Sequence, residues 1–571
     1  MGKRIFFATL LGVYIKVTKS AGHSYIQLAE SFRDDTGKSR QRVLSTFGRV
    51  DETGGQVDSI LNALLRAKGR TADEPQIEFE SALSLGDVWA LHRLWLEVGF
   101  DALARVFRRA RYTTAVEHAI RVMVFNRLCD PDSKLGVLRW LETVSIPEVD
   151  GASLTHQQLL RSMDALMDHQ QAVEDVVAQQ LRPMVDQDLS LVFYDLTTIS
   201  VDGRTVLDDD VRHYGMSKEG LIARQFMLGV VQTAEGLPIY HEVFDGNQAE
   251  APTLLPTLKK VLARFPHIRR LIIVADRGLL SLDNMQSLQA IELDDGRMLE
   301  FILAVPARRY GDFMDILTRF QAKVTDPEEE TIDETRWQDL RLVIAHHPVR
   351  AQEQTEWRRA QIKDLEDKAL RWAGKLDSQD IGAVHRGRKL SDSGAKARFY
   401  HEVKEAHLAK IVKVDMQSDL FTYQLDEKAL HQAELIDGKL LLVTNVIDLA
   451  PQEIVKRYKS LADIERGFRV LKSEIEIAPV YHRLPQRIRA HAMICFMALI
   501  LYRVMRERLK MAKSNLSPER ALAQLKRIHR HQIKVNDRPL TGVSTLTREQ
   551  SELLGALALK KPSRKDQLNL L

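Results

Sequence analysis

Cysteine is scarce in this sequence. The 571 residues include only Cys129 and Cys495, which lie far apart and outside any metal-binding spacing. Two such residues form neither a disulfide framework nor a cysteine-based zinc site. This content fits a protein of the reducing cytosol, and we expect a cytoplasmic location.

The sequence also has little excess charge of either sign, since 82 Lys and Arg residues nearly balance 78 Asp and Glu residues. A protein with this balance binds nucleic acid only where positive charge is concentrated locally. Such a concentration occurs at the C-terminal end, because residues 503–571 hold 16 Lys and Arg residues but only 6 Asp and Glu residues.

Low-complexity tracts, internal repeats and long hydrophobic runs are absent as well. The apolar run at residues 490–502 is too short to span a bilayer and predicts a buried helix. The run at residues 5–15 follows basic residues, as in a signal peptide, but no small-residue cleavage site comes after it, so we do not expect export.

Residues 13–50 alternate between apolar and polar side chains and predict three strands, with turns at SAGH and DDTGK. Lys38, Arg40 and Arg42 share one face of the third strand by its two-residue period. That face is either a solvated strand surface or a ribbon that contacts DNA phosphates. The pattern by itself favours the solvated surface.

Residues 80–187 show helical periodicity, for example in VWALHRLWLEVGF. Strands and helices alternate after them. Strands are predicted at LSLVFYD, which ends at Asp195, and at RQFMLGVVQT, IYHEVFD, LIIVAD, which ends at Asp276, and EFILAVP. With helices at residues 251–264 and around LDNMQSLQ, the order β-β-β-α-β-α-β predicts an α/β fold with a mixed sheet.

Residues 307–435 break this rhythm with charged helical text, a basic loop at HRGRKLSDSGAKAR and a strand at LFTYQLD, followed by a strand at KLLLVTNV. We interpret this segment as an α+β insertion before a core helix that begins near Ser460. The apolar stripe of that helix is Leu461, Ile464, Phe468, Leu471 and Ile475.

Carboxylates at the ends of two neighbouring strands are the first candidate functional residues. Asp195 and Asp276 would repel each other unless a positive charge lies between them. Mg²⁺ suits such a site, because it prefers a few carboxylates together with water and phosphate oxygens. Glu465 could complete the site, since it shares one helix face with Arg469 and Lys472. On a generic helix this pattern is more often a salt-bridged surface.

The strand order with Asp195, Asp276 and Glu465 resembles the ribonuclease-H-like core of DDE transposases. The segment that contains Tyr458, Glu465 and Lys472 resembles the Tyr-Arg-Glu-Lys signature of one large group of bacterial insertion-sequence transposases, in which a β-rich insertion precedes the glutamate. Further matches over residues 14–510 are DLTT, FDGN, ADRG, FRVLKS followed by PVYHR, RQRVLSTFGRVDE and LCDPDSK. Leu461 stands where the signature has its arginine.

The resemblance implies that the two aspartates and the glutamate are catalytic and hold two Mg²⁺ (or Mn²⁺) ions for attack on a phosphodiester. It also implies that Arg277, Tyr458 and Lys472 hold DNA near the scissile bond, with Lys472 as a point charge on phosphate. We expect Arg469, one turn beyond Glu465, to replace the missing arginine, because a guanidinium binds phosphate in bidentate fashion.

The function implied is a transposase that cuts at transposon ends and transfers the strands into target DNA. A stand-alone nuclease on the same core is the alternative, but it needs neither the insertion nor the N-terminal region. An inactive DNA-binding relic is a third reading, against which the three acidic residues argue. The expected partner is double-stranded DNA, both terminal inverted repeats and target, and paired ends imply a homodimer.

The chain is expected to comprise six segments. They are an N-terminal β-ribbon (13–50), a helical region for DNA-end binding or dimerisation (80–187), the first part of the ribonuclease-H-like core (188–306), the insertion (307–447), the second part of the core with the glutamate helix (448–511) and a basic C-terminal region (512–571).

Overall fold

The structure is a computed structural model that describes most of the chain. The described residues are 12–20, 23–49, 62–69, 77–112, 115–185, 190–203, 210–216, 222–248, 251–266, 268, 270–275, 296, 298–326, 328–381, 389–460, 469–535 and 538–562. The chain forms two compact units, residues 1–81 with 531–542 and residues 82–530 with 543–571. Several sheets and many helices give a mixed α/β fold, as the sequence predicts.

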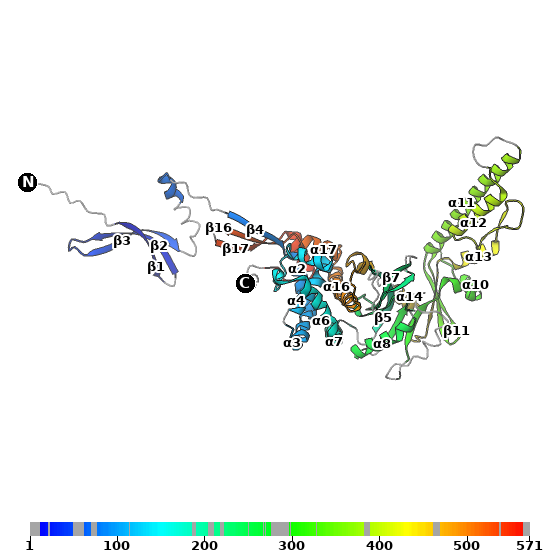
Figure 1. Ribbon diagram of the computed structural model, residues 1–571, viewed down its shortest axis with the longest axis horizontal. Coiled ribbons are helices and arrows are strands. Elements are labelled where there is room, and N and C mark those ends of the chain that lie inside the picture. Colours follow the sequence, from blue (N-terminus) through cyan, green and yellow to red (C-terminus); the bar gives the residue numbers. More distant parts are fainter. Residues whose placement is uncertain are drawn as a thin grey trace, which may run out of the picture. The chain divides into compact units, whose positions relative to one another are not determined.

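The first unit contains a three-stranded antiparallel sheet in the order β1-β2-β3 (Figure 1). Its strands are β1 (Val13–Ser20), β2 (His23–Arg33) and β3 (Ser39–Arg49), which confirms the three predicted strands. Asp34 closes the β2–β3 turn, because its carboxylate accepts hydrogen bonds from the backbone N–H groups of Thr36 at 3.0 Å and Lys38 at 3.1 Å. This side-chain bonding is typical of Asp in turns and fixes where β3 begins.

A second three-stranded sheet brings segments from both ends of the chain together, in the order β17-β16-β4. Its strands are β4 (Ile77–Ser84), β16 (His529–Val535) and β17 (Arg538–Val543). No sequence pattern predicts this sheet. The pairing partners of β4 lie more than 440 residues away, as in the hydrogen bond of 3.0 Å from the Ser81 hydroxyl to Gln532, so they leave no local pattern.

The second unit begins with the predicted helical region. Its helices are α2 (Gly86–Val98), α3 (Leu103–Arg109), α4 (Val116–Cys129), α5 (Lys134–Leu141), α6 (His156–Asp168) and α7 (Gln170–Leu181). Three C-terminal helices pack with them: α16 (Pro485–Met511), α17 (Pro518–Leu525) and α18 (Arg548–Ala556). α16 contacts α4, α6 and β8 and so links the helices to the central sheet.

α16 is longer than the sequence predicts. It has 27 residues and would be long and apolar enough to cross a membrane, but 89% of its most apolar window is buried inside the protein. The predicted buried helix is therefore confirmed, whereas its predicted length is wrong. The apolar run extends at both ends through residues such as Ile488 and Met505, which are buried between basic neighbours.

The central sheet of the second unit has nine strands. They are β5 (Ser190–Ser200), β6 (His213–Met216), β7 (Ile222–Thr233), β8 (Pro238–Asp245), β9 (Leu271–Ala275), β10 (Glu300–Ala304), β11 (Thr331–Trp337), β12 (Leu340–His346) and β15 (Lys439–Thr444). The order is β11-β12-β15-β10-β9-β5-β7-β6, and β8 pairs with β7. β5, β9 and β10 run parallel to one another, while every other described pair in this sheet is antiparallel.

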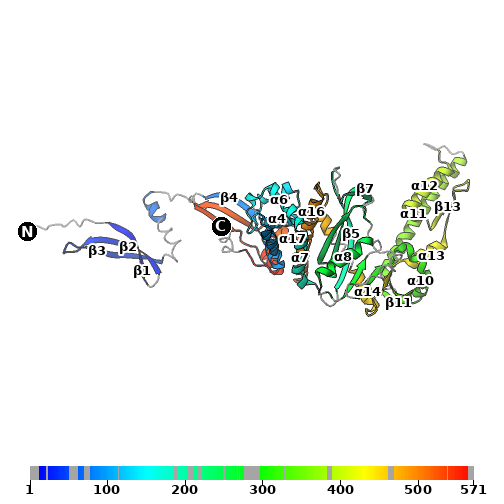
Figure 2. The same ribbon diagram turned by 60° about the horizontal axis from the view of Figure 1, so that its bottom comes forward.

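Helices cover both faces of this sheet. α8 (Ala251–Arg264), at its predicted position, packs with α7 on one face, where the hydroxyl groups of Tyr194 and Thr253 lie 2.7 Å apart (Figure 2). α16 packs on the other face, where its Phe496 ring stacks on His241 of β8. α14 (Pro451–Lys459) also packs on this second face, where Ile454 and Val455 contact a smaller core that includes Ile272 and Val274 of β9. The start of the predicted core helix falls on residues 461–468, which lie outside the described residues, and α14 ends just before them at Lys459.

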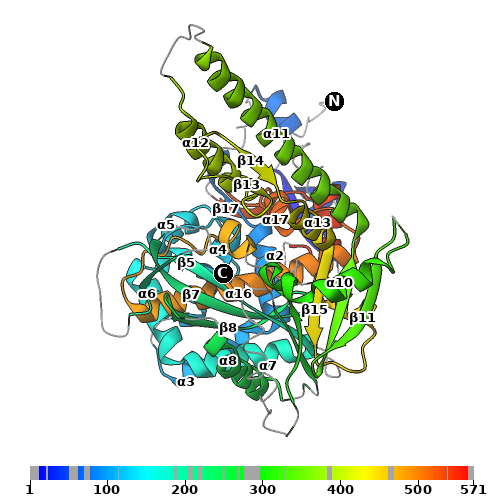
Figure 3. The ribbon, with the colours of Figure 1, turned by 90° about the vertical axis from the view of Figure 1, so that its right-hand side faces the viewer.

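The predicted insertion contains both sheet strands and a part that leaves the sheet. β11, β12 and β15 belong to the central sheet, while α11 (Pro348–Asp380) and α12 (Asp392–Glu405) run away from it side by side (Figure 3). With β13 (Val412–Val414), β14 (Tyr423–Leu425) and α13 (Glu427–Ile436) they enclose a core of their own around Phe399.

Two local predictions need correction. Part of the predicted basic loop is helical, because Ser391 caps the start of α12 by accepting a hydrogen bond from the N–H of Gly394 at 3.1 Å. The predicted strand end at Asp195 is also wrong, since β5 continues to Ser200. The residues after Asp195 include the β-branched Thr197, Thr198 and Ile199, which favour a strand, and β7 pairs with all of them.

Candidate functional site

Asp195 lies in the middle of β5, where its backbone is paired with Val230 of β7. On its other side, β5 pairs with β9 only from Ser190 to Phe193, and the last parallel pair is Phe193–Val274. Asp195 therefore lies two residues beyond the end of the described pairing with β9. Its neighbours Tyr194 and Leu196 are buried in the large core.

The other predicted catalytic residues, Asp276 and Glu465, lie outside the described residues, as does Arg277. Asp276 directly follows Ala275, the last residue of β9. Glu465 belongs to residues 461–468, which separate the end of α14 from a described helical segment at 469–473. Among the residues that the structure describes, no group of three His, Cys, Asp or Glu side chains could hold a metal ion.

Three residues of the proposed signature region are described. Tyr458, near the end of α14, is half-buried against the smaller core. Arg469 is exposed and Lys472 is half-buried, while Val470 and Leu471 between them are buried. Arg469 and Lys472 therefore both reach the surface of one helical turn, on the side away from the core.

The three basic residues predicted for the N-terminal sheet have different surroundings. Arg40 forms an ion pair of 2.8 Å with Asp34. Arg42 pairs with Glu30 and lies over the Phe32 ring, 5.7 Å from the ring centre. Lys38 lies in the turn just before β3, exposed, and no described acidic residue pairs with its ammonium group.

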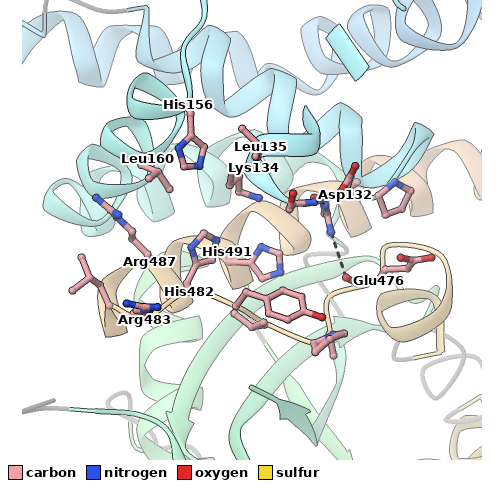
Figure 4. Close-up of a pocket in the computed structure, with 18 residues that line it drawn as sticks. Asp132, Lys134, Leu135, His156, Leu160, Glu476, His482, Arg483, Arg487 and His491 are labelled. Atoms are coloured by element: carbon pink, nitrogen blue, oxygen red, sulfur yellow. Dashed lines mark hydrogen bonds between the residues drawn. The ribbon is translucent and has the colours of Figure 1, made fainter. Parts of the chain in front are cut away.

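A pocket of about 580 Å³ lies in the second unit, between the start of α5 and the connector that follows residues 469–473 (Figure 4). Arg127, Lys134, His482 and His491 are among its lining residues. Val480 of the connector forms a bridge with Val201, the residue after β5. Through this bridge the pocket adjoins the end of β5, which is the strand that carries Asp195.

Burial shapes the ionisation of the groups in this pocket. Burial and, to a smaller extent, the charge of the nearby Arg127 lower the pKa of Lys134 to about 7. Burial and the charge of Lys134 lower the pKa of His482 to about 3 and that of His491 well below its usual value. The histidines are therefore neutral near pH 7, and Nε2 of His491 donates to the carbonyl of Ile477 at 3.0 Å.

No sequence pattern assigns these pocket residues a role, although LCDPDSK, which ends at Lys134, and PVYHR, which contains His482, resemble family text. A buried cluster also escapes prediction, in which Asp210 accepts hydrogen bonds from Arg212 at 2.7 Å and Arg224 at 2.9 Å. A DVR sequence by itself does not predict burial, so local patterns give no signal for this cluster.

Comparison with known families agrees with the resemblance. The transposase DDE domain matches residues 186–501, which is more than half of the chain, so the protein belongs to the bacterial insertion-sequence DDE transposases. The N-terminal domain of the IS1634 family transposases matches residues 15–76, which include the β1-β2-β3 sheet. No curated protein matches the chain. The protein therefore acts in DNA transposition and is a DNA-acting enzyme of the transposase class.

Proposed function

We propose that the protein catalyses metal-dependent cleavage at transposon ends and transfer of the cut strands into target DNA. Asp195, Asp276 and Glu465 are the proposed catalytic carboxylates, and their ligands are two Mg²⁺ or Mn²⁺ ions. The register between β5 and β9 is the observation that carries this proposal.

Continued past the described residues, the register would bring the two aspartates to equivalent positions. In the last described pair, Phe193 lies opposite Val274, and each proposed aspartate follows its residue of this pair by two positions in the sequence. Continued by two residues, the parallel pairing would put Asp195 beside Asp276, at the strand spacing of roughly 5 Å. Two carboxylates at that spacing need a cation between them to remain ionised.

The same register predicts which face of the sheet the aspartates share. Phe193 is paired with Val274, which belongs to the smaller core, so the two-residue period predicts that Asp195, two residues after Phe193, is directed to that face of the sheet. That is the face on which α14 packs and to which Val274 contributes. Glu465 follows the end of α14 by six residues, so the chain can return it to this face.

We propose that β8-β7-β5-β9-β10 is the ribonuclease-H-like core, and that the segment from α11 to α13 is the main body of the insertion. β5 is antiparallel to β7 and parallel to β9, and β9 is parallel to β10. The long connection between β10 and α14 therefore leaves the sheet and returns to it through β15. We retain the proposal of six segments, in which the main body of the insertion is now smaller than the expected residues 307–447.

The donor set fits divalent ions. Three carboxylates with room for water and phosphate oxygens are the ligands that Mg²⁺ prefers. When bound, such ions activate the attacking oxygen and stabilise the leaving oxygen of the phosphodiester. The chain supplies the positioning: Arg469 and Lys472 bind backbone phosphate, with Arg277 and Tyr458 next to the scissile bond. The N-terminal sheet with Lys38, Arg40 and Arg42 adds contacts to DNA, and a homodimer pairs the two ends.

The test uses the full chain, a duplex from the DNA that flanks its coding sequence, and Mg²⁺. Asp276→Ala or Glu465→Ala should reduce nicking by roughly a thousandfold, because several kcal/mol of transition-state stabilisation are lost. Gel-shift affinity for the same duplex should remain close to that of the wild type. Glu474→Ala is the matched control, since Glu474 is exposed on the same segment. Full nicking by Glu465→Ala would refute the proposed site.

A further inference from the structure

The pocket beside α5 contains two buried cations. Arg127 and Lys134 are 4% and 5% exposed, and both line the pocket. Arg127 donates to backbone carbonyls, those of Asp132 and, at 3.3 Å, Glu476. Across the described part of the chain, no carboxylate forms an ion pair with either cation.

Such an arrangement is unfavourable without an anion. A buried charge is stable when it is paired, and two neighbouring buried charges of the same sign also repel each other. The lowered pKa of Lys134 has both of these causes, namely burial and the charge of Arg127. The two cations therefore attract an anion into the pocket more strongly than exposed cations would.

The other charged residues of the pocket wall also favour an anionic ligand. Arg483 and Arg487 add positive charge, although Arg487 is already paired with Asp164 at 2.7 Å. Two acids also line the pocket: Asp132 is paired with Arg139 at 3.3 Å, and Glu476 is exposed at the edge. Figure 4 shows Lys134 and His482 on opposite walls, between α5 and the connector.

We propose that this pocket binds a phosphate group, and that its source is the backbone of the transposon-end DNA. The inference rests on the proposed function for the source of the phosphate. The connector that forms one wall follows the helical segment 469–473, which contains Lys472, and forms a bridge to the residue after β5 through Val480 and Val201. A DNA strand held at Asp195 and Lys472 thus passes close to the pocket.

The principal test replaces Lys134 by methionine, which has a similar length and no charge. Lys134→Met should weaken binding of the flanking-DNA duplex roughly tenfold in EDTA, because one charge-assisted phosphate contact is lost. The slope of log affinity against log salt should become shallower by about 1. Lys259→Met, an exposed site on α8, is the control and should change neither value.

A second arm identifies the source of the phosphate. Thermal melting is measured in inorganic phosphate and in chloride at equal ionic strength. If phosphate stabilises the wild type and not Lys134→Met, while DNA binding is equal in both, the pocket binds free phosphate and the DNA assignment is overturned. If neither DNA binding nor phosphate stabilisation depends on Lys134, the whole proposal is overturned.

A second variant and the nicking activity of the wild type complete the test. If Lys134→Met does not fold, Arg483→Met replaces it, because Arg483 is exposed at the pocket edge. Unchanged DNA affinity, salt slope and phosphate stabilisation in that variant would also overturn the proposal. Because binding is measured in EDTA, a failure of the pocket is distinct from a failure of the proposed function, in which the wild type does not nick the duplex in Mg²⁺.

Discussion

Phe193 and Val274 form the last described parallel pair of β5 and β9. Beyond Phe193, the described partner of β5 is β7, which pairs with it as far as Ser200. Pairing with β7 therefore holds the backbone at Asp195 in place. A carboxylate mounted on such a fixed backbone suits a metal ligand.

The proposed aspartate pair predicts a metal-dependent change in stability. Without metal, repulsion between Asp195 and Asp276 should destabilise the folded protein, and Mg²⁺ should raise its melting temperature by binding the folded state alone. Asp195→Asn removes one charge with little change of shape. We expect this variant to melt higher than the wild type in EDTA and to show no rise in Mg²⁺.

Asp202→Asn is the control for that experiment, because Asp202 is exposed just past the end of β5. It should melt like the wild type and keep the Mg²⁺ response. An equal Mg²⁺-dependent rise in Asp195→Asn and in the wild type would argue that the stabilising ion binds elsewhere.

The proposed substitute for the missing signature arginine is testable at Arg469. Its side chain is exposed, so replacement should leave the fold intact. Arg469→Lys keeps the charge and loses the bidentate geometry, and we expect it to slow single-turnover cleavage by roughly tenfold or more. Thermal melting should match the wild type. Cleavage at the wild-type rate would show that Arg469 is an ordinary surface residue.

The ion pairs of the N-terminal sheet predict unequal contributions to DNA binding. Arg40 and Arg42 already pair with acids of the same sheet, whereas Lys38 lies exposed in the turn. An arginine that is already paired must break its ion pair with the carboxylate before it can bind phosphate. Lys38→Ala should therefore reduce the salt slope of DNA binding by about 1, and Arg40→Ala by clearly less. An equal reduction in both variants would mean that the ion pairs open when DNA binds.

Local patterns in the sequence predict those elements that have a clear apolar pattern of their own. β7 and α8 match their predicted ranges closely, since β7 is a continuous apolar strand and α8 has its apolar residues at helical spacing. The end of β5 is missed because its last residues are polar or β-branched, and only pairing with β7 makes them a strand. β4 is missed since its pairing partner β16 lies far along the chain. β11 and β12 pair with each other across a short turn, so a local hairpin signal is present there and goes unrecognised.

For the candidate site as well, sequence motifs predict the residues, whereas their arrangement depends on contacts between distant segments. Motifs predict Asp195, Asp276 and Glu465 as chemical groups, but the register that supports their proximity comes from the pairing of β5 with β9. Lys134 looks like an ordinary first-turn residue of a short helix. Its burial depends on packing against the connector at residues 476–484, which follows it by more than 340 residues, so sequence alone gives no sign of it.

Lys134 also predicts a specific dependence of stability on pH. Its pKa is lowered to about 7 in the folded protein from the ordinary 10.5. Between these values the unfolded chain holds a proton that the folded protein releases, so the free energy of unfolding rises with pH by at most about 1.4 kcal/mol per unit. Below about pH 7 the buried ammonium is charged in both states, and its full cost is present.

Lys134→Met should remove this dependence. In urea denaturation without phosphate, the variant should be several kcal/mol more stable than the wild type at about pH 6, and the difference should shrink towards about pH 9. The groups around Lys134 in both proteins are Arg127, His482, Arg487, His491 and Cys495. Because the Lys134 charge also lowers the pKa values of the two histidines, the trend that reports Lys134 is the one above their ordinary pKa of 6.5. Lys259→Met should show no such trend. A difference independent of pH would mean that the Lys134 ammonium has an acidic partner and a normal pKa, which would also remove the physical basis for anion binding in the pocket.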